Sequence, residues 1–260
     1  MGIFFEPFTE NKCCLCGSSD RLTGEHKIKA SAIKAEFGDE ILKIGRFDDV
    51  DHPFKFAQSP KSKAFHFKGK LCADCNNAKT QAPDREFEHF NENAREFIDK
   101  NLQTDSIFKN HNYVIGSGSY LNLFRYFAKL LCCHMAEIQA PRHIHLSSFA
   151  TGKVHKNCVW LSVDRDWEYE RMSQCYGDHP YAAHGGLVVY GRKDTGEATG
   201  FHSTLTLGPL RYVFYTRLNW FERSALKISH PAFNDWCREK VMNAIDNPIT
   251  ETDLRRLGLK

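Results

Sequence analysis

Two pairs of cysteines have the spacing of metal ligands. Cys13 and Cys16 are separated by two residues, and so are Cys72 and Cys75. Four thiolates in two such pairs match the tetrahedral ligand set of a closed structural zinc site. Gly17 directly follows the first pair, which suits a tight backbone turn around a zinc ion. We therefore predict one structural Zn²⁺ ion, held by these four cysteines.

Cys14 is an alternative source of the first thiolate. It directly follows Cys13, so both residues stand close to the expected metal position. The Cys-x-x-Cys spacing to Cys16 favours Cys13 as the ligand. We therefore expect Cys14 to be dispensable for zinc binding.

The ten cysteines of this 260-residue chain are expected to be reduced. A short secreted chain with so many would suggest disulfides, but the first residues lack the charged and long apolar segments of a signal peptide. We predict a cytoplasmic protein, in which paired cysteines point to metal. The cysteines outside the expected zinc site stand in apolar or aromatic surroundings that suit a reduced core: Cys132, Cys133, Cys158, Cys175 and Cys237.

Three further residues could carry out chemistry beside the zinc. The pair Glu25-His26 lies between the two cysteine pairs, and Asn76 directly follows Cys75. A histidine is largely neutral at cellular pH and can accept a proton from water. Carboxylate and amide oxygens suit a hard ion such as Mg²⁺, which can stabilise charge on a phosphate. These residue types are sufficient for phosphodiester hydrolysis.

The order Cys-x-x-Cys, Glu-His, Cys-x-x-Cys-Asn resembles the zinc-bearing branch of the HNH (ββα-metal) endonucleases, over roughly residues 11–101. The resemblance implies that His26 is the general base. It also implies that Glu25 and Asn76 bind one catalytic Mg²⁺ or Mn²⁺ ion. Two features depart from the family pattern: His26 lacks the frequent His-x-x-Pro context, and no Asn precedes Cys72 at the distance of the family's loop-holding Asn.

Two strands and a helix must position these residues. We expect strands at 22–29 and 64–68, and a helix at 84–102 in which aromatic residues recur at helical spacing. Glu25 and His26 are adjacent on the first strand, so their side chains should point to opposite faces unless the strand twists locally. Asp84 and His89, on the helix, could add to the site, although solvated helix residues are the simpler interpretation.

Lysines surround the expected active site, although the formal net charge is only +3. Residues 52–83 contain six lysines and one acid, Asp74, and a basic field suits a polyanion. The alternative is an ordinary solvated surface. The lysines predicted to contact DNA phosphates are Lys61, Lys63, Lys68, Lys70 and Lys79.

The rest of the chain predicts an α+β fold. Residues 119–138 are apolar almost all round but include charged residues such as Lys129, so we expect a buried helix rather than a membrane span. Strands at 158–163, 186–190, 198–207 and 210–218 should form an antiparallel meander, followed by a helix at 231–245. We predict two domains: an HNH nuclease domain with zinc (1–102) and an α+β accessory domain (103–260).

These features predict a metal-dependent HNH endonuclease that hydrolyses DNA. Its accessory domain would recognise DNA, a modified base or a protein partner, and no membrane is involved. A role in restriction or phage defence suits the size and layout by analogy only. Two alternatives remain open. One is a zinc-stabilised nucleic-acid-binding module with an inactive nuclease site, and the other is an effector subunit that a partner protein activates.

Overall fold

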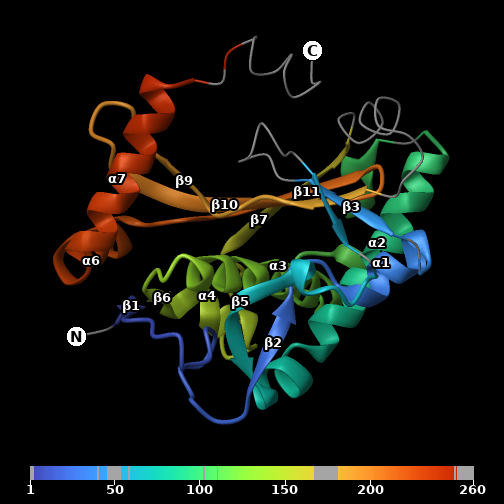
Figure 1. Cartoon of the computed structure of the whole chain (residues 1–260), viewed down its shortest axis with the longest axis horizontal. Helices are drawn as coiled ribbons and strands as arrows, with labels where there is room; N and C mark the ends of the chain where they lie inside the picture. The colour runs from blue at the N-terminus through green and yellow to red at the C-terminus, as the bar shows by residue number, and fades with distance from the viewer. Residues whose placement is uncertain are drawn as a thin grey trace.

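The computed structural model describes residues 3–39, 41–45, 54–57, 59–101, 103–109, 111–166, 181–248 and 250. It confirms the α+β class, with a seven-stranded sheet packed on a layer of helices (Figure 1). In order across this sheet, the strands are β4 (Phe54–Ala57), β3 (Leu42–Gly45), β8 (Tyr181–His184), β10 (Ala198–Leu207), β11 (Leu210–Arg217) and β7 (Val159–Arg165), with β9 (Val188–Gly191) also paired to β10.

The predicted meander is present in this sheet. Strands β9, β10 and β11 pair antiparallel in sequence order, and β7 follows on the other side of β11. The turn between β9 and β10 contains Gly196, whose positive φ of 70° is a backbone conformation that favours glycine. Local turn chemistry and alternating side chains were therefore sufficient to predict this part of the fold.

Helix α3 (Gly118–Glu137) lies at the centre of the molecule. It packs against α2 (Gln81–Asp99), α4 (Ile144–Ala150) and β5 (His66–Cys72), and it also contacts β7 and β10 of the large sheet (Figure 1). Leu123, Phe127 and Leu131 recur at helical spacing and are fully buried. The prediction of a buried helix is confirmed. Within the described part of the chain, no helix is long and apolar enough to cross a membrane.

The two strands and the helix expected around the candidate site follow one another as predicted. β2 (Leu22–His26) pairs antiparallel with β5, and the π-helical turn Asp74–Lys79 (η2) leads from β5 into α2. The register shifts between Gly24 and His26, so the strand bulges at Glu25. Because of this bulge, the side chains of Glu25 and His26 need not alternate strictly between the two faces of the strand.

The large sheet crosses the predicted domain boundary at residue 102. Strands β3 and β4 precede this boundary, yet β3 pairs in parallel with β8 from the later part of the chain. Buried apolar residues from both parts also form one core cluster. The division into two domains at residue 102 stays a prediction. The remaining elements are β1 (Phe5–Glu6), paired with β6 (Arg142–His143), α1 (Ala30–Phe37), α6 (Trp220–Ser229), α7 (Pro231–Asp246) and 3-10 turns at Lys63–Phe65, Thr104–Lys109 and His111–Tyr113.

A close approach of β5 to α3 predicts the effect of one substitution. A Cβ atom at Gly69 would lie 2.8 Å from the Cβ of Ala136, which has no flexible side chain to move away. Gly69→Ala should therefore destabilise the fold by about 1–3 kcal/mol, the usual cost of overpacking. Gly186→Ala is the matched control, because a Cβ there meets nothing within 4 Å. Thermal unfolding of both variants checks this, and equal melting temperatures would contradict the packing described.

Candidate metal centre and catalytic site

The four predicted zinc ligands come together. The Sγ atoms of Cys13, Cys16, Cys72 and Cys75 all lie within 4.8 Å of one another, so they could hold a metal ion such as zinc. The first two lie in the turn after β1, where the Gly17 amide donates to the Cys13 carbonyl and φ at Gly17 is 76°. The other two lie at the end of β5 and in η2. Two segments far apart in sequence thus supply one tetrad of thiols.

The thiols of the cluster lie close enough to shift one another's pKa. A hydrogen bond from Cys75 lowers the pKa of Cys13 to about 4, and the same contact raises the pKa of Cys75. A zinc ion bound here would replace the thiol protons and add its binding energy to the folding free energy.

Cys14 is not part of the cluster. Its Sγ lies 3.7 Å from the Sγ of Cys133 on α3, and both residues are buried. The alternative ligand is therefore excluded by position, and Cys14 instead packs the metal-binding turn against the central helix. All nine cysteines in the described part of the chain are free thiols.

Asn76 connects the cysteine cluster to the strand that carries Glu25 and His26. Its Nδ2 donates to the hydroxyl of Thr23 over 3.0 Å and to the carbonyl of Gly24 over 3.2 Å. These bonds hold the backbone immediately before Glu25. Asn76 thereby helps to fix the strand that carries Glu25 and His26. No Asn before Cys72 stands at the distance needed for that role.

His26 lies at the end of β2 and faces a second histidine. It pairs in register with His66 at the start of β5, and the two ring centroids are 3.9 Å apart. Burial, followed by the nearby His66 and Lys129, lowers the pKa of His26 to about 4. The half-buried imidazole is therefore neutral at cellular pH and can accept a proton. His66 was not predicted as part of the site, because only the strand register brings it to this position.

Glu25 lies in a buried ion cluster. Lys129, on α3, is 1% exposed, and its Nζ lies 2.8 Å from Glu25 Oε1 and 2.5 Å from Asp84 Oδ1. Glu25 itself is 8% exposed. Burial alone would lower the pKa of Lys129, but the two carboxylates raise it above the usual value. Burial also raises the pKa of Asp84, and Lys129 opposes that shift.

A divalent ion at Glu25 and Asn76 would have to compete with Lys129 for the Glu25 carboxylate. The Oε1 of Glu25 already accepts from a buried ammonium, and the Asn76 amide donates to β2. In the described part of the chain, the four cysteines are the only group of three or more His, Cys, Asp or Glu residues placed to share an ion. The family resemblance alone did not predict that Lys129 would bind both Glu25 and Asp84.

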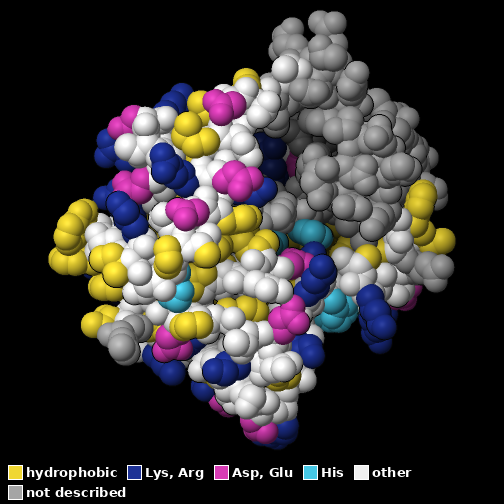
Figure 2. Space-filling model, turned by 60° about the vertical axis from the view of Figure 1, so that its left-hand side comes forward, with side chains coloured by type: hydrophobic (Ala, Val, Ile, Leu, Met, Phe, Trp, Pro, Cys, Tyr) yellow, Lys and Arg dark blue, Asp and Glu magenta, His cyan; other side chains and the backbone are white. Residues whose placement is uncertain are grey.

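The lysines predicted to bind DNA are exposed, and two of them share one side of β5. Lys68 and Lys70 alternate with buried residues on this strand. Lys79 pairs with Asp74, which offsets part of its charge. On the face shown in Figure 2, basic and acidic side chains are interspersed. DNA binding by Lys61, Lys63, Lys68, Lys70 and Lys79 stays a prediction.

Comparison with known proteins gives no match from which an activity could be inferred. No protein-family model, curated protein sequence or solved structure matches it. The HNH resemblance therefore rests on the residues themselves: the two cysteine pairs, Glu25-His26 and Asn76.

Loss of one cluster thiol should release the metal. We expect wild-type protein to carry about one zinc per chain and Cys72→Ser to lose it, together with cooperative folding around β2 and β5. Cys14→Ala is the control, since this buried thiol lies against Cys133, and the variant should retain zinc. Elemental analysis of folded protein measures both. Wild-type protein that folds without zinc would refute the structural role of the cluster.

Removal of the buried ammonium should destabilise the fold in a pH-dependent way. Lys129→Met leaves the buried Glu25 and the partly buried Asp84 without their shared cation, which should cost about 3–5 kcal/mol at neutral pH. The pKa of Asp84, already raised by burial, should rise further. The folded variant then binds a proton more tightly than the unfolded chain, so its deficit should shrink as the pH falls from 7 to 5.

Chemical denaturation at both pH values measures this change. Lys100→Met is the control, because Lys100 forms only an exposed pair with Glu96. Equal stability losses in the two variants would show that Lys129 makes no buried ion cluster.

Proposed function

We propose that this site hydrolyses phosphodiester bonds in nucleic acid, with His26 as the general base. The observation that carries the proposal is the position of His26, half-buried at the end of a strand pair whose other end holds the thiol tetrad. The partly exposed imidazole can reach a water molecule, while β5 and Asn76 restrict its movement. Zinc in the tetrad would fix this geometry and take no part in the reaction.

The neighbouring residues suggest how a substrate would be held. Lys68 and Lys70 lie on one side of β5, the strand that carries His66, and can contact phosphates without reading bases. Mg²⁺ or Mn²⁺, as the HNH resemblance implies, would stabilise charge on the reacting phosphate. An ion bound by Glu25 must first displace Lys129 from that carboxylate.

The wider role follows from the same proposal. We infer that DNA is the substrate and that residues 103–260 recognise DNA, a modified base or a protein partner. Free thiols suit a reducing cytoplasm. A function in restriction or phage defence rests on analogy with proteins of similar layout.

A second candidate function is a zinc-stabilised binding module without catalysis. The ion cluster favours it, because Glu25 is committed to Lys129 and the described residues form no second metal group. Such a protein would bind nucleic acid through its exposed lysines but leave the phosphodiester bonds intact.

Cleavage assays with one substitution separate the two functions. His26→Ala should lower the rate about 10²–10⁴-fold, the contribution of a positioned general base, while zinc content and DNA affinity stay unchanged. His89→Ala is the matched control, because this exposed histidine on α2 lies beside Glu92. This variant should cleave DNA like the wild type.

The assay follows labelled DNA with Mg²⁺ or Mn²⁺ at several concentrations. If His26→Ala cuts as fast as His89→Ala, His26 is not the base. If the wild type binds DNA and cuts at no metal concentration, the non-catalytic binding module is the better description.

A further inference from the structure

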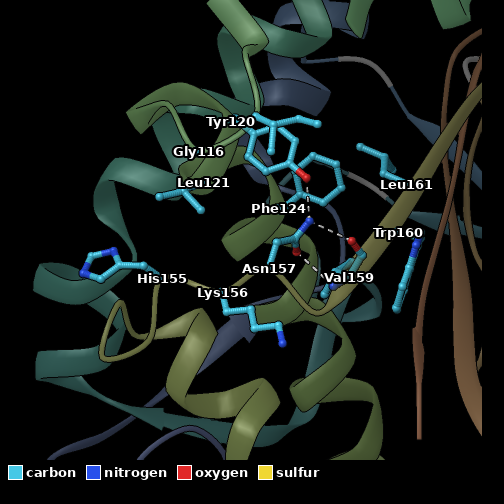
Figure 3. Close-up of a pocket in the computed structure, with 11 residues that line it drawn as sticks. Gly116, Tyr120, Leu121, Phe124, His155, Lys156, Asn157, Val159, Trp160 and Leu161 are labelled. Atoms are coloured by element: carbon cyan, nitrogen blue, oxygen red, sulfur yellow. Dashed lines mark hydrogen bonds between the residues drawn. The ribbon is translucent and has the colours of Figure 1, made fainter. Parts of the chain in front are cut away.

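A cavity of about 490 Å³ lies apart from the cysteine cluster, between the first turns of α3 and the start of β7. Residues 155–157 form its lower border in the view of Figure 3. Its volume lies within the range of about 300–1,000 Å³ found for small-molecule sites. The proposed hydrolysis does not use this cavity.

Aromatic rings form two of its walls. Tyr120 and Phe124, one turn apart on α3, contribute rings whose centroids are 4.5 Å apart. Trp160, on β7, lies at another side of the cavity and is 43% exposed (Figure 3). Its indole stacks on Tyr215 at 5.5 Å and 11°, and the Arg217 guanidinium lies 5.4 Å from its centroid. These contacts hold a large planar surface in place at the cavity.

Asn157 fixes the shape of the cavity between these walls. Its Nδ2 donates to the Tyr120 hydroxyl over 2.9 Å and to the Val159 carbonyl over 3.0 Å, while its Oδ1 accepts from the Val159 amide (Figure 3). The two aromatic walls are thus joined by a side chain with little remaining freedom. A rigid cavity loses less entropy when a planar ligand enters.

Basic groups form another border of the cavity. His155 and Lys156 line it, and Arg125 Nη2 lies 3.1 Å from His155 Nδ1. Arg125 does not itself line the cavity, but it contacts the His155 ring, and its buried Nε has no hydrogen-bond partner among the described residues. An ammonium group such as that of Lys156 is a typical partner of phosphate.

We propose that this cavity binds a nucleotide, with the base against Trp160 and Tyr120 and the phosphate beside His155 and Lys156. Aromatic walls accept any base, because each base has a flat π-face, and the basic border complements the phosphate charge. The nucleotide could be a free mononucleotide or one unit of a single strand. The site goes beyond the proposed hydrolysis and does not depend on it.

Calorimetry with adenosine monophosphate tests the aromatic wall. Wild-type protein should bind this nucleotide, and Trp160→Ala should weaken binding about 5- to 150-fold, the range expected for stacking of one base. Trp220→Ala is the matched control, since Trp220 is 65% exposed on α6, away from the cavity, and should bind like the wild type. Zinc content and thermal unfolding show whether each variant is folded.

A second comparison tests the basic border. Lys156→Gln should weaken binding of adenosine monophosphate while leaving binding of adenosine, which has no phosphate, nearly unchanged. Single-stranded DNA and RNA hexamers identify the source of the nucleotide: tighter binding of a hexamer indicates a strand, and equal binding indicates a free nucleotide.

Three results would overturn the proposal: no binding of mononucleotide or hexamer at millimolar concentration, equal losses in Trp160→Ala and Trp220→Ala, or binding of duplex DNA alone. His26→Ala should bind the nucleotide like the wild type. Failure of the proposed hydrolysis is therefore distinguishable from failure of this site.

Discussion

A buried ammonium group connects the two parts of the chain at the candidate site. Lys129 on α3 binds Glu25 on β2 and Asp84 on α2, and a charge at this depth is costly unless its partners are well placed. The positions of these three elements therefore depend on one another. The thiol tetrad holds one end of the β2–β5 pair, and Lys129 acts near the other end, where His26 lies.

Local patterns predicted a large part of this structure. Paired cysteines identified a metal site because ligand spacing within a knuckle is a short-range property. The apolar run around Leu123 and Phe127 predicted α3, since the charges within it exclude a lipid environment. The hairpin at Gly196 followed from its turn residues. In each example, the pattern that carries the prediction is local, although the two cysteine pairs themselves lie far apart in the chain.

Apart from the thiol tetrad, several contacts between distant segments escaped prediction. His66 lies beside His26 because of the strand register, and Lys129 lies beside Glu25 because α3 packs against β5. Neither contact can be predicted from the residues next to it in the chain. The parallel pairing of β3 with β8 was missed for the same reason. Helix α6 was not predicted, although the spacing of Asn219 and Glu222, which form a capping box, was a local signal that could have found it.

The most direct measurement of the central claim is the fate of a single phosphodiester bond in water enriched with ¹⁸O. Hydrolysis at His26 requires that the attacking oxygen come from water, so the new terminal phosphate should carry one ¹⁸O atom when wild-type protein cuts DNA. Mass spectrometry of the product ends reads this directly. Intact DNA in the presence of folded, zinc-loaded protein, or new ends without ¹⁸O, would contradict the account.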